Sequence, residues 1–396
     1  MPVPVRYHLR SLLARRTTTA LTVLAVGFSV AILVLVLALA KGFEISLADT
    51  GRADNVILLR KGATSENVSG LGREVARILM ARPEVAGGPD GQPLAAAEMC
   101  AGIALDKVDA SATAASRGLR SMTNVSIRGT IPGALALRDG IRLAEGRMFR
   151  SGSEEVVIGK ALVGRVKGCV PGGAVAFAGR TMPVVGILDA GGGAQDSEIW
   201  GDAEVLLQIF QRGGYSTVFL RLRDPAGLAA LQAALEADPR LQAKAVSERD
   251  YFRQQAGGQA RFFRIMAYFL ASIMAVGSVF GSTNTLLASL AGRTREIGTL
   301  LAMGYRPVHV RVGFLLEALA IGLAGGIAGV AIAWPINGVA TGTTNWVTFT
   351  EQAFSFAITG EVVAQAVLFA GVVGVVGGVV PAYRAAGLPP TEALRA

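Results

Sequence analysis

Few residues in this chain have the chemistry to hold a metal ion or form a disulfide. It contains two cysteines, Cys100 and Cys169, and two histidines, His8 and His309. None of them lies at the close spacing that metal sites use, so we expect no metal site. The two cysteines could pair in an oxidising compartment or remain thiols, and the sequence leaves both alternatives open.

Motifs for nucleophilic catalysis or nucleotide binding are also missing. The sequence has no HExxH, GxSxG or Walker A pattern. The glycine-rich stretch "DAGGGAQD" at 189–196 is not followed by Lys and Ser or Thr, so we interpret it as a flexible hairpin tip. We therefore predict no catalytic residue and no cofactor bound by this chain.

One short basic stretch carries both helix-stop and helix-start signals. Residues 293–313 read "RTREIGTLLAMGYRPVHVRVG". They predict a helix that continues to Gly304, then a second short helical piece that begins at Pro307 and ends where the chain turns back at Gly313. Such a segment is either an ordinary cytoplasmic loop or the docking site of a partner that supplies energy. The residues alone leave both readings open.

The elements on either side of this stretch are predicted to span a membrane. The 396 residues are 52% hydrophobic and 17% charged, whereas soluble domains carry about 25% charged residues. Four apolar stretches exceed the roughly 20 residues that a spanning helix needs. The first has a second reading, a secretory signal, but it is longer than a signal core. We predict membrane helices at 17–41, 261–292 (with the end of a polar stalk), 314–336 and 362–383.

Basic residues near the helix ends set the predicted orientation. They place the leader at 1–16, the coupling segment at 293–313 and the tail at 384–396 in the cytoplasm. The link at 337–361 has no Lys or Arg and faces outward, as does the long segment at 42–260. The net charge of +9 then reflects cytoplasmic helix ends, and we expect no nucleic-acid partner.

The long outward segment is predicted to fold as an α+β domain. Short β-rich runs bounded by glycine, proline or charge predict strands. Two stretches have helical spacing, at 71–85 and 224–241, and a polar stretch at 247–264 predicts a helical stalk. The strand predictions are Asn55–Arg60, 154–159, 182–189 and 216–222.

Small residues recur at a spacing of four in the membrane stretches. This spacing lets helix backbones approach closely. The faces could pack within one chain or between two chains, and the sequence leaves both open. The predicted packing residues are Gly277, Gly281, Gly322, Gly325, Gly326, Gly329, Gly374 and Gly378.

The stretch "RTREIGTLLAMGYRPVHVRVGFLLEALAIGLAGG" resembles the FtsX-like, MacB-type ABC transporter permeases. Their pattern is R-x-x-E-I-G-x-L-x-A-x-G, a spacer, then F-L-x-E and a glycine-rich helix. The tail "PAYRAAGLPPTEALRA" is similar to the ending of that family, and the leader and "RLAEGRMFRSGSEEVVIG" are similar to other parts of it. The matching positions include Arg293, Glu296, Ile297, Gly298, Leu300, Ala302, Gly304, Phe314, Leu315 and Glu317.

The resemblance implies a bacterial inner-membrane permease with one helix, a large outer domain and three further helices. Two such chains would pair, as a homo- or heterodimer. A separate dimer of ABC ATPase subunits, which would bind the ATP and Mg, would dock on the coupling segment, because only 16 residues precede the first helix. The implied ATPase-coupling residues are Arg293, Arg295, Glu296, Gly298, Gly304, Tyr305, Arg306, His309 and Arg311.

Two functions remain open after the resemblance. The first is mechanotransmission-type export or extraction of a lipidated or amphiphilic substrate, as in lipoprotein-releasing permeases, possible partners being a periplasmic adaptor or a lipoprotein. The second is an FtsX-like device that activates an extracytoplasmic partner such as a cell-wall hydrolase without transport. The size of the outer segment favours the first.

Overall fold

The computed structural model describes residues 16–48, 50–88, 91–108 and 122–389, which form two compact units. The helical unit contains the described residues up to Lys41, then Ala260–Val339, then those from Phe356 onward. The α+β unit contains Gly42–Gln259 and Ala340–Ser355. Most of the predicted leader, including His8, and the end of the predicted tail from 390 lie outside the described residues.

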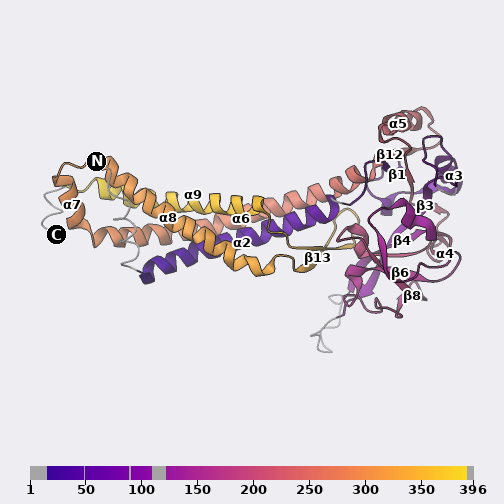
Figure 1. Ribbon diagram of the computed structural model, residues 1–396, viewed down its shortest axis with the longest axis horizontal. Helices are drawn as coiled ribbons and strands as arrows, with labels where there is room; N and C mark the ends of the chain where they lie inside the picture. Colours follow the sequence, from indigo (N-terminus) through magenta and orange to yellow (C-terminus); the bar gives the residue numbers. More distant parts are fainter. Residues whose placement is uncertain (1–15, 49, 89–90, 109–121, 390–396) are drawn as a thin grey trace. The chain divides into compact units, whose positions relative to one another are not determined.

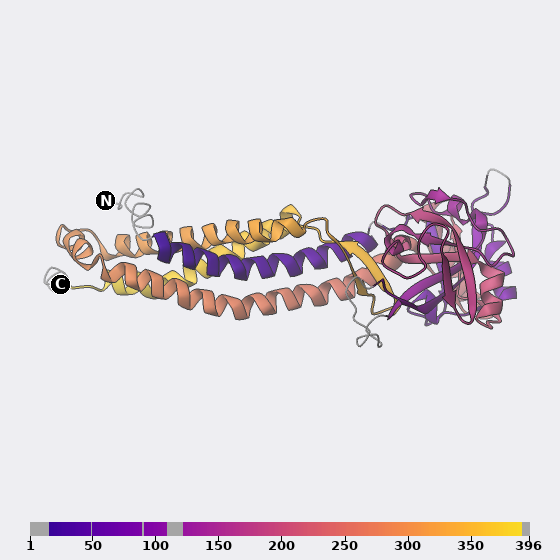
Figure 2. The same ribbon diagram turned by 90° about the horizontal axis from the view of Figure 1, so that it is seen from below.

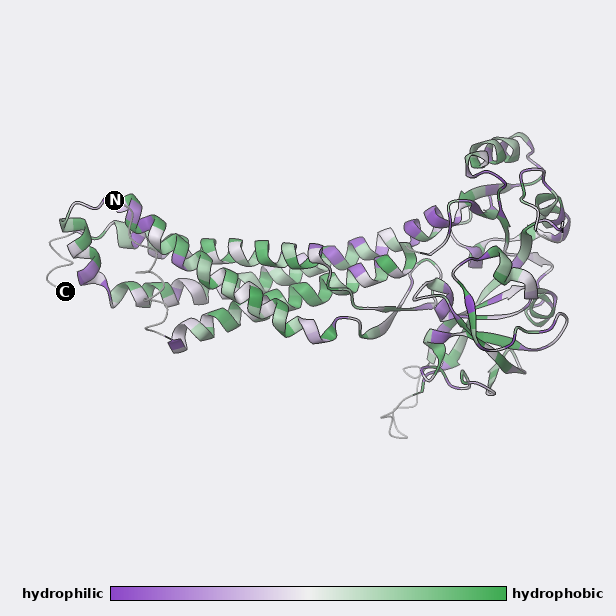
Figure 3. Ribbon diagram, in the orientation of Figure 1, coloured by the Kyte–Doolittle hydropathy of each residue, from purple (hydrophilic) through white to green (hydrophobic). Residues whose placement is uncertain are grey.

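Four long apolar helices confirm the predicted membrane spans. Among the described residues, these four are long and apolar enough to cross a membrane. Within the helical unit they lie side by side (Figures 1 and 2), and hydrophobic residues run along them (Figure 3). The helices are α2 (Arg16–Ala48), α6 (Glu248–Ala291), α8 (Pro307–Ala333), which the short 3-10 helix η8 (Trp334–Ile336) follows, and α9 (Gly360–Ala386).

Glycines bring α8 and α9 into close contact. A Cβ added at Gly322 would lie 2.5 Å from the carbonyl oxygen of Ala370, and one at Gly374 would lie 2.6 Å from that of Ala318. A side chain at either position therefore pushes the two backbones apart.

Hydroxyl groups, in contrast, join α2 to α6. The Thr22 and Thr285 hydroxyls lie 2.6 Å apart, and those of Ser29 and Ser278 lie 2.8 Å apart. In a membrane such interhelical hydrogen bonds help to hold two helices together.

The α+β unit is built on a mixed ten-stranded sheet. Its order is β12-β1-β11-β3-β4-β9-β6-β8-β5, and β7 pairs with β8. Among the described strands, β4–β9 and β6–β8 are the parallel pairs. The strands are β1 (Asn55–Arg60), β3 (Ala95–Asp106), β4 (Met122–Thr130), β5 (Arg142–Gly146), β6 (Val156–Gly159), β7 (Ala174–Phe177), β8 (Arg180–Asp189), β9 (Glu198–Asp202), β11 (Thr217–Arg221) and β12 (Ala243–Ser247).

Short elements complete this unit. A two-stranded sheet pairs β2 (Leu71–Gly72) with β10 (Gly214–Tyr215), and another pairs β13 (Ala340–Thr344) with β14 (Glu351–Ser355). The helices are α3 (Arg73–Met80), α4 (Ala203–Ile209) and α5 (Leu228–Ala237), and the 3-10 helices are η1 (Glu66–Val68), η4 (Pro132–Leu137), η5 (Lys160–Leu162), η6 (Ala194–Ser197) and η7 (Pro225–Gly227).

Besides a small cluster that contains Phe149 and Trp200, two large hydrophobic clusters lie on the large sheet. One lies between α3, α5 and the strands β1, β11 and β12, and the other between α4 and the strands from β3 to β9 (Figure 1). Strand β1 is buried over five consecutive residues, so "NVILLR" reads as a continuous apolar run, as expected of a central strand. Helix α4 begins where the Asp202 carboxylate accepts hydrogen bonds from the amides of Glu204 and Val205.

The predicted α+β class is confirmed, and all four predicted strand runs contain strands. The reading of 189–196 as a flexible hairpin tip is wrong, because β8 and β9 do not pair with each other. The Asp196 carboxylate instead accepts hydrogen bonds from the amides of Ala190 and Gly192, at 2.6 and 2.7 Å. These bonds connect the start of the loop to Asp196 at its end. Cys100 and Cys169 are both buried free thiols.

Candidate functional site

The predicted coupling segment forms a short helix between two membrane spans. Helix α7 (Thr294–Ala302) follows a turn at Gly292 and Arg293 after α6, and a second turn joins it to α8. Gly304 has φ +91°, which favours glycine, and Pro307 opens α8, as its missing amide donor allows. In the helical unit, α7 lies at the same end as the start of α2 and the end of α9 (Figures 1 and 2).

Two details of the sequence interpretation are wrong here. The helix of the second span does not continue into 293–303, because it ends at Ala291 and α7 begins afresh at Thr294. The piece from Pro307 to Gly313 is not a separate interfacial helix, since α8 runs unbroken through Gly313, which is buried. An isolated helix of two turns is marginal, so joining it to the membrane span keeps its backbone hydrogen bonds.

Arg293 points inward and connects α7 to α8 through ion pairs. Its guanidinium lies 3.3 Å from the carboxylate of Glu317 in α8 and 3.6 Å from that of Glu296 in α7. It also lies 5.9 Å from the ring centroid of Phe314. The side chains of Arg293 and Glu317 are 10% and 2% exposed, so this is a nearly buried ion pair. Arg293 and Glu317, which stand at the two ends of the family pattern, are thus in contact.

The other predicted coupling residues separate into an exposed and a covered group. Arg295, Glu296, Gly304 and Arg306 are exposed, together with Met303 and Val308. Gly298 is buried beside Ile297, whose side chain packs into a cluster with Val310, Phe314, Ala382 and Ala385. Tyr305, His309 and Arg311 are partly covered, and the Arg311 guanidinium lies 4.3 Å from the ring centroid of Tyr383 in α9.

The predicted packing glycines also separate into two groups. A Cβ at Gly322, Gly325, Gly326, Gly329, Gly374 or Gly378 would come within 3 Å of a neighbouring helix. At Gly277 and Gly281 it would meet nothing within 4 Å, and both residues are exposed. The first group therefore packs α8 against α2 and α9 within the chain. The second group, Gly277 and Gly281, forms an exposed face of small residues on α6, which we call the open strip.

Sequence reasoning missed the role of the link at 337–361. Its β13–β14 hairpin belongs to the α+β unit, although α8 and α9 of the helical unit flank it in the chain. Phe354 packs edge to face on Phe43 near the end of α2, with ring centroids 5.6 Å apart. The Asn345 and Gln259 side chains also join the hairpin to the start of α6, through hydrogen bonds of 3.1 Å to Gln255 and 3.0 Å to the Thr344 carbonyl.

One carboxylate ties the hairpin to the large sheet. Glu351 in β14 lies 2.8 Å from the Lys107 ammonium and 2.5 Å from the Arg165 guanidinium, and it also accepts a hydrogen bond from Thr123. Burial alone would raise the pKa of Glu351, but its bonds to Lys107 and Thr123 and the nearby charges lower it overall. The only sequence signal for this contact is an acid in a link that lacks Lys and Arg, and that signal does not name the partners.

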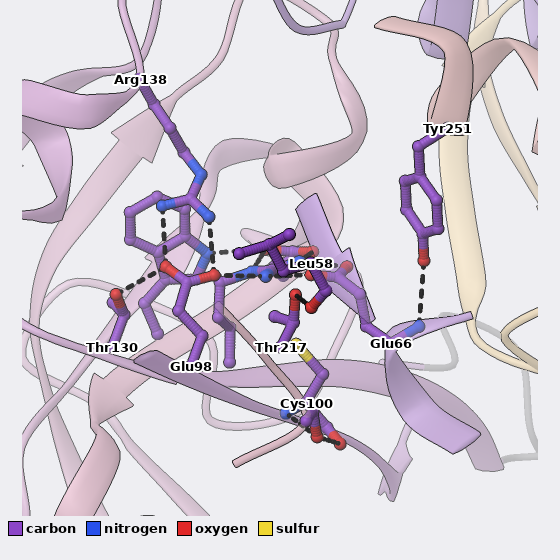
Figure 4. Close-up of polar contacts among 12 residues, drawn as sticks. Leu58, Glu66, Glu98, Cys100, Thr130, Arg138, Thr217 and Tyr251 are labelled. Carbon is purple, nitrogen blue, oxygen red and sulfur yellow. Dashed lines mark hydrogen bonds and ion pairs between the residues drawn. The ribbon is translucent and has the colours of Figure 1, made fainter. Parts of the chain in front are cut away.

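A buried polar network fills the centre of the α+β unit (Figure 4). Arg128 in β4 donates hydrogen bonds to Glu66, Glu98 and Glu198, and Arg138 donates two to Glu98. Burial would raise the pKa of Glu98, yet the two guanidinium groups hold it at about 2. The Tyr251 hydroxyl in α6 accepts a hydrogen bond from the Glu66 amide at 3.0 Å, which joins the network to that helix.

The carboxylates of this network are paired with arginines within the α+β unit. Every carboxylate in it is bonded to a guanidinium group, so none is available as a general base. Among the described residues, no group of three or more His, Cys, Asp or Glu side chains could hold a metal ion.

Comparison with known proteins agrees with this geometry. The family profile described as "MacB-like periplasmic core domain" matches residues 19–238. The profile described as "FtsX-like permease C-terminal" matches residues 268–390, which include α7. The first alone covers more than half of the chain.

Individual relatives carry consistent names. The chain is 24% identical to "Uncharacterized ABC transporter permease YknZ" of Bacillus subtilis (strain 168), over 99% of this chain and 98% of the relative. It is 25% identical to "Macrolide export ATP-binding/permease protein MacB 2" of Aeromonas hydrophila subsp. hydrophila, over 98% of this chain but 60% of that longer protein.

A solved structure of the extracellular domain of the YknZ transporter from Gram-positive bacteria matches 49% of this chain and 100% of its own, with 17% identity and a TM-score of 0.35. The family matches, the spanning helices and the α+β unit together establish that this chain belongs to the MacB/FtsX type of ABC transporter permeases, which are multi-pass membrane proteins.

Proposed function

We propose that this chain couples ATP hydrolysis by a separate ATPase to movement of its α+β unit outside the cytoplasmic membrane. The observation that carries the proposal is the geometry of α7. It is a short helix between two spans, braced from inside by Arg293 and Glu317, with Arg295, Met303 and Arg306 exposed. A surface that is basic and apolar together, on a rigid support, suits a protein partner.

A separate ATPase fits the absence of a Walker A pattern from the 396 residues. It also fits the relative YknZ, which this chain matches over nearly its full length and which is named a permease only. ATP and Mg would then be bound by an ATPase dimer and not by this chain.

Charge reversal of the exposed arginines tests the docking proposal. We expect Arg295→Glu with Arg306→Glu to abolish co-purification of the ATPase, because both side chains are exposed and take part in no hydrogen bond or ion pair among the described residues. The matched control is Arg295→Lys with Arg306→Lys, which keeps the charge. Arg311 is less suitable, because its reversal also breaks the contact with Tyr383. Undiminished co-purification of the Glu variant, with normal membrane insertion, would contradict the proposal.

We propose that two permease chains pair through the open strip at Gly277 and Gly281. A Cβ added at either glycine would meet no described residue beyond its own stretch of helix, and the large side chains of Ile273 and Phe280 beside them are exposed. Two such strips can approach closely across a dimer. The proposal leaves open whether the second chain is identical.

The proposed output is export or extraction of a lipidated or amphiphilic substrate. In the described membrane spans, the polar contacts away from the helix ends are hydrogen bonds of hydroxyl groups and not ion pairs, so this arrangement supports motion more than ion coupling. The second candidate is activation of an extracytoplasmic partner, such as a hydrolase, without transport.

Photo-crosslinking separates the two outputs. A photoreactive residue in place of Phe28, which is exposed on α2 and is not part of the open strip, is expected to capture lipidated substrate during turnover if the chain exports. Capture of a soluble partner by a photoreactive residue at an exposed α+β position such as Glu145, without capture of lipidated substrate at position 28, would instead favour the regulatory function.

A further inference from the structure

A polar cavity of about 160 Å³ lies within the α+β unit. Its walls come from the end of α2 and the turn after it, the segment that follows η4, the loop at 190–193 and the first residue of α6, Glu248. Cavities that hold whole drug-sized ligands are larger, so this one has room only for a small group or a few waters.

Five of the side chains in these walls are both polar and almost completely buried. Three of them already have partners. Arg138 donates two hydrogen bonds to Glu98, Ser46 donates to the Gly192 carbonyl at 2.8 Å, and Thr50 donates to the Ser46 carbonyl at 2.8 Å. The five are Ser46, Thr50, Arg138, Gln195 and Glu248.

The remaining two, Glu248 and Gln195, have unused polar atoms. Oε2 of Glu248 accepts hydrogen bonds from the Asn55 side chain at 2.9 Å and the Arg52 amide at 3.1 Å. No described residue donates to its other oxygen, Oε1, or forms an ion pair with Glu248. The Gln195 side chain makes no hydrogen bond with the described part of the chain, although it is only 4% exposed.

Among the charged residues of the cavity wall, Glu248 is also the one that forms no ion pair with a described residue. Arg138 is paired with Glu98, and Asp139 is paired with Arg52 and Arg221. Burial raises the pKa of Glu248 even though Arg138 acts to lower it. A buried carboxyl group in this position either keeps a proton or meets a cation.

The backbone at Gly51, which lies beside Glu248 in space, leaves room for the Glu248 side chain. Gly51 has φ +91°, and a Cβ at Gly51 would lie 2.5 Å from Cγ of Glu248. Only glycine at this position lets the carboxyl group lie against the wall of the cavity.

We propose that this cavity binds a small primary ammonium group. Its N–H groups would donate to Oε1 of Glu248, to the Gln195 carboxamide oxygen and to the Ser46 hydroxyl oxygen. A primary ammonium has three donors and no acceptor, which matches a wall whose unused atoms are mainly acceptors. The ammonium belongs either to a free small amine or to the ethanolamine headgroup of a phospholipid. The proposal does not depend on the coupling function proposed above.

The test uses the full chain in nanodiscs of phosphatidylglycerol, with methylammonium as the probe and thermal unfolding as the readout. We expect a saturable rise of the unfolding midpoint at constant ionic strength. Tetramethylammonium, which is larger and has no N–H donor, should give none. Glu248→Gln and Gln195→Leu should weaken the apparent affinity at least tenfold. Gln352→Leu removes a buried carboxamide that does not line this cavity and should leave the affinity unchanged.

Equal responses to methylammonium and tetramethylammonium would overturn the proposal. So would a Glu248→Gln variant that is as stable as the wild type or more stable and keeps the methylammonium response, since Glu248 would then be only a neutral buried acid. If Glu248→Gln does not fold, an unchanged affinity in Gln195→Leu has the same meaning. Discs of phosphatidylethanolamine assign the source: a midpoint that is already raised and no longer responds to methylammonium identifies the lipid headgroup.

Discussion

Arg293 shows how one residue can define a corner between three helices. It contacts Glu296 in α7 and Glu317 in α8 from the turn that follows α6. A nearly buried charge without its partner is costly, so the pair fixes where α7 begins relative to α8. Arg293 therefore supports the proposed docking surface from within and is not part of that surface.

A double-mutant cycle tests this pair. We expect Arg293→Gln and Glu317→Gln each to lower the thermal unfolding midpoint, and the double variant to lose less than the sum, with a coupling of about 1–3 kcal/mol. The comparison pair is Lys41 and Glu361, which are 3.1 Å apart but 28% and 58% exposed. Its coupling should stay below about 1 kcal/mol. Additive effects at Arg293 and Glu317 would show that the two charges do not act as a pair.

Glu98 gives the α+β unit a predictable response to acid. Its pKa of about 2 lies below the ordinary 4.5, so its contribution to the free energy of unfolding is complete above about pH 4.5 and is lost as the pH falls towards 2. The loss is on the order of 3 kcal/mol. Glu98→Gln should be less stable at neutral pH but should show a shallower decline over that range, measured by thermal unfolding. Parallel pH profiles for variant and wild type would contradict this assignment.

At the scale of elements, the glycines of the membrane helices have two different roles. Gly374 packs against the backbone of α8, where any side chain would collide with Ala318 and Gly322. A Cβ added at Gly281 on α6 would meet no described atom beyond its own stretch of helix within 4 Å. The same residue type at the same spacing thus serves packing within the chain in one place and remains available for a partner in the other.

Matched substitutions separate these roles. We expect Gly374→Val to lower the free energy of unfolding of the monomer by at least about 1–3 kcal/mol. The reason is that the added side chain would meet backbone atoms of α8, which cannot move aside as a flexible side chain can. Gly281→Val should leave the thermal midpoint of the monomer nearly unchanged and reduce dimerisation, measured by energy transfer between labelled chains in nanodiscs. Full dimerisation of the Gly281 variant would contradict pairing through this strip.

At the scale of the whole molecule, the chain passes between its two units four times, and the β13–β14 hairpin accounts for two of those passages. The hairpin is continuous in sequence with α8 and α9. It is bonded through Glu351 to Lys107, Thr123 and Arg165 in the α+β unit. Any movement of α8 and α9 that the proposed ATPase produces therefore has a covalent route to the hairpin, and the ion pairs and hydrogen bond of Glu351 connect the hairpin to the α+β unit.

Glu351→Gln tests that route in the assembled transporter. We expect the variant to bind the ATPase and hydrolyse ATP normally but to lose most of its export or activating output, with faster amide hydrogen exchange at 340–355. Glu361→Gln, an exposed acid at the start of α9, is the control and should retain both activities. Normal output from the Glu351 variant together with faster exchange would show that the hairpin contact is not needed for coupling.

The sequence alone determined the membrane helices and the class of the outer domain, whereas the orientation that it predicts from the basic helix ends stays a prediction. The two confirmed properties follow from local composition: apolar length, and strand or helix periodicity. It also determined the stop at Gly304 and the start at Pro307, because backbone conformation at glycine and proline is a local matter. Along the coupling segment it could not tell Arg293, which faces inward, from Arg295 and Arg306, which face outward.

Only the tertiary structure decided which groups meet across long stretches of chain. Glu351 and its three partners, Arg128 and its three glutamates, and the cavity between Ser46, Gln195 and Glu248 join residues far apart in sequence. A one-dimensional pattern does not specify such contacts, because they depend on how strands and helices pack. For the same reason both roles of the glycines stayed open at the level of the sequence, and the packing of α8 against α9 separated them.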